Sequence, residues 1–307
     1  MDNQMNKNTN INYFLSSELF YCFKKSKITI IAFIVLVIII LLALVGPIFT
    51  IQNPYDLSSL ELANSYIPPV WLQTEEMGLP DYSSQFLLGT DQQGRDMFSA
   101  IVYGSRVSLF IGIVATIFSA SIGVFLGLIS GYFGGKIDGF IMRIADIQLS
   151  FPSMLIALFL MGAFGRGITN ILICLTLVGW VKYARTVRGE TLSVKKMEYI
   201  EATKVIGFKN PRIIFKHVMP NVFTSIIVLT TIQIGSFILF EATLSFLGLG
   251  VSSSKPSLGM LCNEGFKVFY GGLWWVSIFP GLYIVIIVFA INLLGDFLRD
   301  QLNPKLK

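Results

Sequence analysis

The feature that most constrains this sequence is a series of long apolar runs without a charged residue. The first occupies residues 28–49, and its 22 residues are enough to cross a hydrocarbon core of about 30 Å. A secretory signal peptide also starts with basic residues, but its apolar region is only roughly 7–15 residues long. The run therefore predicts a retained helix. Five further runs follow at 107–135, 147–165, 167–181, 218–240 and 268–295.

The charge content supports six transmembrane helices and argues against a pair of soluble domains. Asp, Glu, Lys and Arg make up 13% of the residues, whereas a soluble domain typically has about 25%. The shortest run, 167–181, ends at Lys182, whose long side chain can reach the membrane interface. Three cysteines lie far apart, and His217 is the single histidine. We therefore expect an all-α integral membrane protein with no metal site and no disulfide framework.

The basic residues assign a direction to the helices. With a cytoplasmic N-terminus, the cytoplasmic segments hold 18 lysines and arginines and the extracytoplasmic segments hold 5, as the positive-inside rule favours. These charges lie beside the spans and form no separate basic domain, so they do not indicate a nucleic-acid partner. The predicted division is a cytoplasmic tail (1–27), a first helix (28–49), an extracytoplasmic loop (50–106), a core of five helices (107–297) and a cytoplasmic C-terminal tail (298–307).

The segment between the fourth and fifth runs, residues 182–216, is too long for a simple turn and has a helical pattern. Gly207 and the Asn210-Pro211 pair are typical stop signals for a first helix. A second amphipathic stretch at 212–218 runs to Pro220. Two short helices are therefore expected at the cytoplasmic surface, where they could bind acidic lipid head groups or dock into a groove of a partner. The periodic positions are Met197, Ile200, Glu201, Lys204, Val205 and Phe208.

Residues 201–220 also carry a spaced motif. They read Glu-Ala-Thr, three residues, Gly207, nine residues and then His-Val-Met-Pro. This resembles the EAA loop of bacterial ABC importer permeases, in which a second Ala stands at Thr203, an aliphatic residue at His217 and a Leu at Met219. The His-x-x-Pro-Asn ending resembles the peptide-importer version of that loop.

Three other segments carry the same resemblance. Residues 89–96 read Gly-Thr-Asp-Gln-Gln-Gly-Arg-Asp, and residues 104–109 read Gly-Ser-Arg-Val-Ser-Leu. Both resemble the region before the second span in the C-type subunit of peptide permeases. Residues 241–250, Glu-Ala-Thr-Leu-Ser-Phe-Leu-Gly-Leu-Gly, resemble the end of span five in the same subunit. The resemblance implies a type I ABC importer permease fold with six transmembrane helices, in a bacterial cell membrane.

By this resemblance, the 190–220 segment would be a coupling loop seated in a cleft of an ATPase subunit. Glu201 would contact the ATPase or cap its own helix, and Gly207 would end that helix. Pro220 would fix the re-entry of the chain into span five. Small residues such as Ala202 and Gly207 allow backbones to approach closely. The other positions that the resemblance assigns to coupling are Thr203, Phe208 and His217.

The resemblance also implies the rest of a transporter. A homologous permease would form the other half of the pathway, two ATPase subunits would bind ATP, and an extracytoplasmic binding protein would deliver the substrate. The expected substrates are oligopeptides first and dipeptides second, and nickel or metal–chelator complexes are the alternative. The chain has no G-x-x-x-x-G-K-[ST] phosphate loop and no catalytic cluster. We therefore expect neither a cofactor bound to this chain nor an enzyme activity.

Two rival classes are disfavoured by the residues themselves. A secondary transporter predicts ionisable residues in the middle of spans and an inverted repeat, and the sequence shows neither. A membrane-embedded enzyme needs a catalytic cluster, which is missing, and the motif spacing in the 190–220 loop argues against a simple scaffold.

Charged residues near the predicted outer ends of the spans are further candidates. Thr90 and Gln93 fit a capping box, which is the favoured interpretation of that segment. Alternatively, Asp91, Arg95 and Asp96 form an ion-pair cluster near the outer gate or a docking surface for the binding protein.

Two other features of the spans allow more than one interpretation. Glu241 ends an uncharged run near the outer end of span five, so solvation and a role in the pathway are about equally expected. Gly123, Gly127 and Gly131 continue a four-residue spacing that begins at Ser119. Small residues on one helix face allow close helix packing, which favours contacts within the subunit over a subunit interface or pore lining.

Overall fold

The computed structural model describes residues 18–56, 58, 60–74, 78, 81–251 and 255–302. Much of the predicted N-terminal tail and residues 303–307 of the predicted C-terminal tail lie outside the described residues. Regular structure in the described part is helical, apart from one isolated bridge between Thr90 and Asp96. By length and composition, five helices can span a membrane, and one bent helix pair makes a sixth crossing if it counts as a single span. The all-α membrane fold is therefore confirmed.

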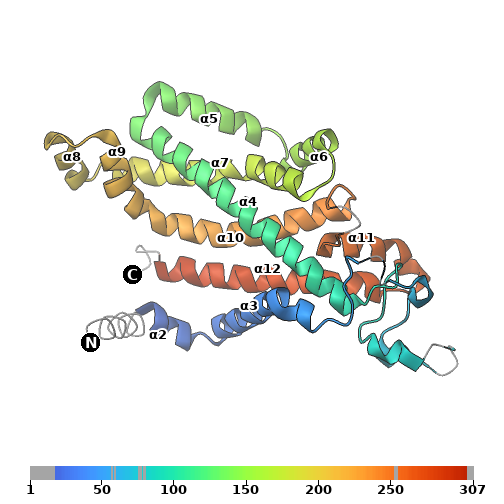
Figure 1. Cartoon of the computed structure of the whole chain (residues 1–307). Helices are drawn as coiled ribbons and strands as arrows, with labels where there is room; N and C mark the ends of the chain where they lie inside the picture. Colours follow the sequence, from blue (N-terminus) through green and yellow to red (C-terminus); the bar gives the residue numbers. More distant parts are fainter. Residues whose placement is uncertain are drawn as a thin grey trace.

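Five long helices form the body of the molecule and run between its two ends (Figure 1). The short helix α2 (Glu18–Lys25) and the end of the last long helix lie at one end, and the short helix α11 (Leu258–Val268) lies at the other. The five long helices are α3 (Lys27–Val45), α4 (Met97–Phe133), α7 (Ile168–Val194), α10 (Met219–Phe246) and α12 (Trp275–Leu302).

Local sequence sets both ends of α3. At its start, the Ser26 hydroxyl accepts a hydrogen bond from the Thr29 backbone N–H at 3.3 Å, which caps the helix. Its regular part ends at Val45, one residue before the Gly46-Pro47 pair. The chain then tightens into a 3₁₀ turn, Gly46–Ile48, with Pro47 in its first turn, where a proline is tolerated. A helix long and apolar enough to span a membrane thus lies at Lys27–Ile48, within a residue of the predicted 28–49.

Between α4 and α7 the chain forms a bent helix pair, and the prediction of one helix at 147–165 is wrong in detail. The pair consists of α5 (Gly135–Leu149) and α6 (Ser153–Phe164), which meet at an angle of 86°. Pro152 lies at the break, where a proline cannot continue the helix that precedes it. The prediction missed α5 because that helix carries charges. Asp138 of α5 pairs with Arg188 of α7, with the carboxylate Oδ1 at 2.5 Å from Nε.

Two other spans are longer than predicted. α7 continues to Val194, well beyond Lys182, so Lys182 does not mark the interface end of a short helix. α4 begins at Met97, inside the segment predicted as the 50–106 loop. With a rise of 1.5 Å per residue, the 37 residues of α4 extend over about 55 Å, which exceeds a hydrocarbon core of about 30 Å.

The row of small residues in α4 packs against α7 inside this chain. A Cβ atom added to Gly123 would lie 2.4 Å from the Trp180 carbonyl oxygen, and one on Gly127 would lie 2.7 Å from that of Ala184. A Cβ on Gly131 would lie 2.9 Å from the Arg188 carbonyl oxygen. Each of these distances is below van der Waals contact. Packing within the subunit is therefore what the row provides, and no pore lining is needed to explain it.

Candidate functional site

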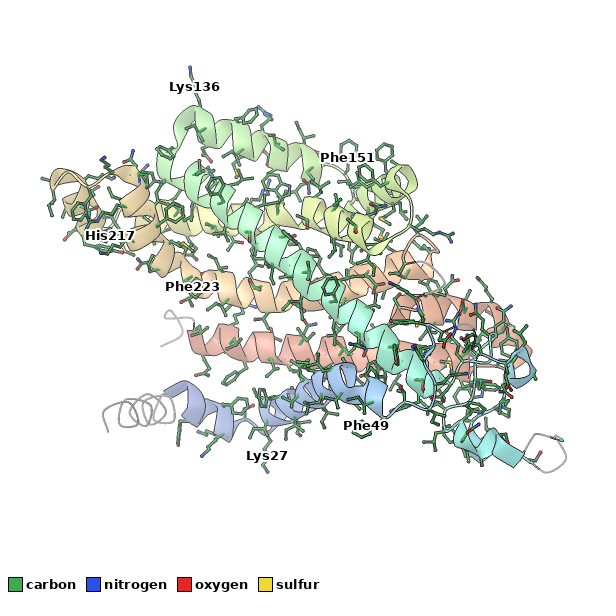
Figure 2. All side chains as sticks on the ribbon, in the orientation of Figure 1. Lys27, Phe49, Lys136, Phe151, His217 and Phe223 are labelled. Atoms are coloured by element: carbon green, nitrogen blue, oxygen red, sulfur yellow. The ribbon has the colours of Figure 1, made fainter. Side chains whose placement is uncertain are left out.

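A bent segment between α7 and α10, residues 195–220, projects from one end of the bundle, and we call it the elbow (Figure 1). It contains α8 (Glu198–Val205), α9 (Asn210–Ile213) and a π-helical turn (Ile214–Val218). Figure 2 places His217 of the elbow toward the same end of the molecule as Lys136. We refer to this as the elbow end and to the opposite end as the far end.

The second of the two predicted short helices is not separate. α9 and the π-helical turn run directly into α10, so that residues 210–246 form one apolar rod. Pro220 is the second residue of α10. A proline ring inside a regular helix clashes with the carbonyl four residues before it. The wider turn avoids this clash, with the Met219 N–H bonded to the Ile214 carbonyl.

The first predicted helix, α8, ends at Val205, and Gly207 turns the chain away two residues later. Gly207 has φ +86°, a left-handed conformation that favours glycine. Its N–H donates to the Lys204 carbonyl at 3.0 Å, and the Phe208 N–H donates to the Thr203 carbonyl at 3.1 Å. This pair of bonds closes a helix C-terminus in a Schellman motif. Thr203, which replaces an alanine of the motif, donates its hydroxyl to the Ile200 carbonyl at 2.7 Å.

One face of the elbow is anchored in the bundle. Ile200, Ile213 and Val218 are fully buried and belong to an apolar cluster that also contains Val187 of α7. The hydroxyl of Tyr132, near the end of α4, hydrogen-bonds to the Asn210 side-chain oxygen at 3.0 Å. The elbow is therefore held against α4 and α7 as well as being continuous with α10.

The opposite face of α8 is exposed and partly apolar. Val205 is 88% exposed and Ile206 is 69% exposed, next to the exposed Glu201 and Ala202. The N-cap position of α8 is Met197, so Glu201 does not cap its own helix. Within the described residues, the Glu201 carboxylate forms no hydrogen bond or ion pair, although its backbone N–H donates to the Met197 carbonyl at 3.2 Å. Contact of Glu201 with an ATPase subunit stays a prediction.

Ring contacts of Phe208 hold together the part of the elbow that follows α8. The Phe208 ring contacts both the Arg212 guanidinium, 4.3 Å from the ring centroid, and the His217 ring, 5.9 Å away at an interplanar angle of 18°. A cation over an aromatic face is attracted by the ring quadrupole. His217 thus makes a ring contact within the elbow. No group of three or more residues able to hold a metal ion occurs in the described part of the chain.

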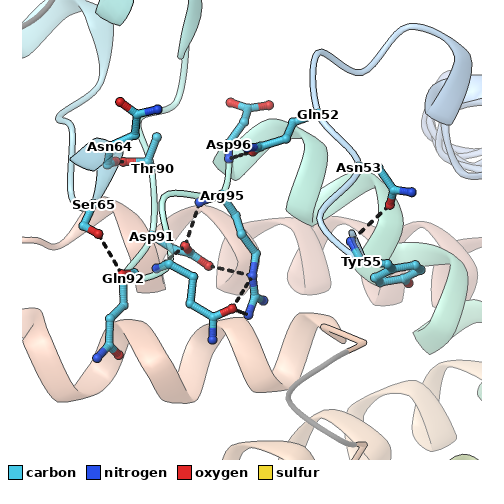
Figure 3. A network of polar contacts seen from close by, with 11 residues as sticks. Gln52, Asn53, Tyr55, Asn64, Ser65, Thr90, Asp91, Gln92, Arg95 and Asp96 are labelled. Atoms are coloured by element: carbon cyan, nitrogen blue, oxygen red, sulfur yellow. Dashed lines mark hydrogen bonds and ion pairs between the residues drawn. The ribbon is translucent and has the colours of Figure 1, made fainter. Parts of the chain in front are cut away.

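At the far end, Asp91 and Arg95 form a buried pair (Figure 3). The Asp91 carboxylate accepts hydrogen bonds from the backbone N–H groups of Gln93 (2.8 Å) and Arg95 (2.9 Å), and it lies 3.6 Å from Arg95 Nε. Both side chains are fully buried. Burial raises the pKa of Asp91, and the Arg95 charge opposes that shift.

The predicted capping box at Thr90 is wrong, because no helix starts there. The Thr90 hydroxyl instead donates to the Asn64 carbonyl at 2.5 Å and accepts from the Ile67 N–H at 2.7 Å, which joins two loop segments. The actual N-cap of α4 is Asp96, which accepts from the Ser99 N–H at 2.8 Å. Asp96 therefore lies outside the Asp91–Arg95 pair. Because all three charged side chains are buried, none of them is an exposed docking surface in this chain.

Glu241 is fully buried, so the interpretation that solvent surrounds it is wrong. Its carboxylate accepts a hydrogen bond from Ser108 of α4 at 2.8 Å and one from Ser245 of α10 at 2.6 Å. Ser257, the N-cap residue of α11, is a third hydroxyl partner. Only Ser245, four residues along the same helix, could have been suspected from the sequence. The carboxylate joins three elements at the far end.

Two family models match the chain. Residues 123–307 match the binding-protein-dependent transport system inner membrane component. Residues 16–69 match the N-terminal transmembrane domain of oligopeptide transport permease C.

Curated relatives match over most of their length. The chain is 37% identical to the dipeptide transport system permease protein DppC of Bacillus subtilis, over 92% of this chain and 84% of that protein. It is 39% identical to the oligopeptide transport system permease protein OppC of the same organism, over 93% and 88%. It is 38% identical to OppC of Escherichia coli, over 92% and 89%.

A solved structure shows the same fold. The inward-facing MetNI methionine ABC transporter aligns with a TM-score of 0.56 at 21% identity, covering 67% of this chain and 98% of that chain. This agrees with the permease fold implied by the motif in the elbow. With the matched family models and the relatives above 30% identity, the helices and the elbow lead to one conclusion: this chain is a multi-pass inner membrane permease of the binding-protein-dependent transport family, of the oligopeptide and dipeptide permease C type.

Proposed function

We propose that this chain is one of two permease halves of an ATP-driven importer for oligopeptides or dipeptides. The names of its relatives support that substrate class. The observation that carries the mechanism is the exposed apolar edge of α8, formed by Val205 and Ile206 on an anchored elbow. Exposed apolar side chains beside a charged residue are typical of a contact site for another protein.

The missing parts of the importer lie in other chains. A second permease completes the pathway, two ATPase subunits bind ATP, and a binding protein delivers the substrate at the far end. We infer that α8 seats in a cleft of an ATPase subunit, where Glu201 and Val205 make contacts. The elbow end is then cytoplasmic, in line with the excess of lysines and arginines in the segments assigned to that side.

The anchoring of the elbow supports a mechanical role. A displacement of α8 reaches α10 through the continuous rod of residues 210–246, and it reaches α7 through the apolar cluster around Ile200. The ATPase subunits drive the permease between inward-open and outward-open states only if ATP binds the two states with different affinity. We infer that the elbow is the part of this chain through which movement of the ATPase subunits reaches the spans.

The proposal is tested by charge substitutions on the exposed edge of α8. We expect Val205→Asp and Glu201→Lys to leave membrane insertion intact. Peptide uptake by the complex in proteoliposomes should fall about tenfold or more, as for loss of one interface anchor. ATP hydrolysis should no longer respond to peptide-loaded binding protein.

The matched control is Lys136→Glu, a charge reversal at the same end of the molecule on a side chain that points away from the bundle (Figure 2). Uptake by this variant should equal that of the unaltered complex. Normal uptake by both α8 variants would exclude α8 as the coupling element.

A further inference from the structure

A large groove between α3, α4, α10 and α12 is not used by the coupling mechanism proposed for the elbow. Its volume is about 770 Å³, within the roughly 300–1,000 Å³ typical of small-molecule sites. α3, α4, α10 and α12 form its walls, mainly through aliphatic and aromatic side chains such as Ile40, Phe110, Ile113 and Ile291. The groove therefore offers a long apolar surface.

Two basic side chains line the same groove. Arg106 of α4 and Lys255, which precedes α11, are both exposed. No ion pair of either residue forms within the described part of the chain, and the Arg106 guanidinium lies 6.0 Å from the centroid of the Tyr103 ring. Arg106 directly precedes the uncharged run of α4. It thus lies at the boundary between the apolar part of that helix and its far end.

The other polar groups of the lining are already bonded within the chain. The Thr231 hydroxyl donates to the Ile227 carbonyl of its own helix at 3.0 Å. The Tyr55 hydroxyl donates to the Tyr103 carbonyl at 3.1 Å. What the groove offers a ligand is therefore an apolar wall with positive charge at one end.

We propose that this groove binds one anionic phospholipid, with its phosphate head group at Arg106 and Lys255 and its acyl chains along α3 and α4. Basic side chains near a membrane surface attract anionic head groups, and acyl chains need no hydrogen-bond partner. A peptide fits less well, because its backbone N–H and C=O groups would find no partner along the apolar walls, and unpaired polar groups are costly there. One detail rests on the proposed function: if the elbow end is cytoplasmic, this lipid lies in the outer leaflet.

The test is lipid retention by the purified full-length chain with the subunits that it keeps. Native mass spectrometry measures binding of phosphatidylglycerol against phosphatidylcholine with identical acyl chains. We expect a clear preference for phosphatidylglycerol. Arg106→Gln with Lys255→Gln should weaken phosphatidylglycerol binding about 30-fold, and Lys255→Gln alone about fivefold. Phosphatidylcholine binding should not change.

Lys267→Gln is the matched control, because it removes one far-end positive charge that does not line the groove. Its preference for phosphatidylglycerol should match that of the unaltered chain. Equal binding of the two lipids by the unaltered chain would overturn the proposal, as would an unchanged preference in the double variant. A photoreactive analogue at Phe110 adds a second measurement: cross-linking to phospholipid supports the proposal, and cross-linking to a second protein chain overturns it.

Discussion

The two ends of the molecule differ in which side chains they bury and which they expose. At the far end, Asp91, Arg95 and Glu241 are fully buried, and each is bonded to groups of this chain. At the elbow end, Glu201 is exposed beside Val205 and Ile206, which are apolar and largely uncovered. One end buries groups that prefer water, and the other exposes groups that avoid it.

This contrast shows which parts of the chain are complete by themselves. A buried charge is tolerated where partners satisfy it, and for Asp91 and Glu241 those partners come from this chain. An exposed apolar edge is satisfied only when another surface covers it. Substitutions at the far end should therefore act on stability, and those on α8 should act on assembly and coupling.

The largest effect should come from Arg95→Met. It leaves the Asp91 carboxylate buried without its counter-charge, and breaking a buried pair typically costs about 3–5 kcal/mol. Thermal unfolding in detergent should show a large loss of stability. The double variant Asp91→Asn with Arg95→Met keeps the acceptor for the two backbone N–H groups and removes the lone charge, so it should recover most of the loss. Equal destabilisation of both variants would contradict the ion-pair explanation.

The next effect concerns Glu241. Glu241→Ala leaves buried serine hydroxyls such as Ser108 without their acceptor, at an expected cost of about 1–3 kcal/mol. Glu241→Gln keeps the volume and one acceptor oxygen and should cost less. The order of unfolding temperatures should be unaltered chain, Gln and then Ala. If Glu241→Gln changes which peptides are taken up, Glu241 has a role in the pathway besides this structural one.

A smaller and local effect is expected for Gly207→Ala at the elbow. The left-handed φ of +86° costs a residue with a Cβ roughly 1–2 kcal/mol. That cost should destabilise the end of α8, so hydrogen exchange of the α8 amides should become faster. Exchange at the loop of residues 89–96 should stay unchanged. Faster exchange at both ends would show that the two regions are less independent than their contacts indicate.

The smallest effect on stability should come from Val205→Ser and Ile206→Ser. These side chains pack little in this chain, and substitutions at such positions usually change stability by about 0.5 kcal/mol or less. Unfolding of the isolated chain should be unchanged, while the purified complex should lose ATPase subunits on dilution. A stable complex with both serines present would remove the proposed difference between the two ends.

Much of the fold could be predicted from the sequence because uncharged runs mark segments that lie in a membrane. The prediction failed where a charge is neutralised by another helix. Asp138 of α5 lies 50 positions before its partner Arg188, and a pattern read along the chain does not detect a pair that far apart. α7 was taken to end at Lys182 because charged residues follow it, and two of these, Arg185 and Arg188, pair with Asp146 and Asp138 of α5.

At the candidate site, too, features set by neighbouring residues were predictable, and contacts between distant residues were not. Gly207 was recognisable because a left-handed helix end depends on neighbouring residues alone. The surroundings of Glu241 were not, since its hydroxyl partners come from α4, α10 and the start of α11. The error at Thr90 has a related cause: a capping box needs a helix behind it, and the chain between Asp91 and Arg95 turns back on itself instead.

The π-helical turn at Ile214–Val218 also determines how the elbow and span five move together. A turn of this kind holds one residue more than a regular helix, so tightening it would twist the two flanking parts by about 100°, the angle of one residue. Pro220 opposes the tightening, because its ring would then press against the Lys216 carbonyl. Pro220 thus opposes rotation of α9 relative to α10 about the helix axis. In the proposed mechanism, a displacement of α8 would therefore shift or tilt α10 without rotating it about its own axis.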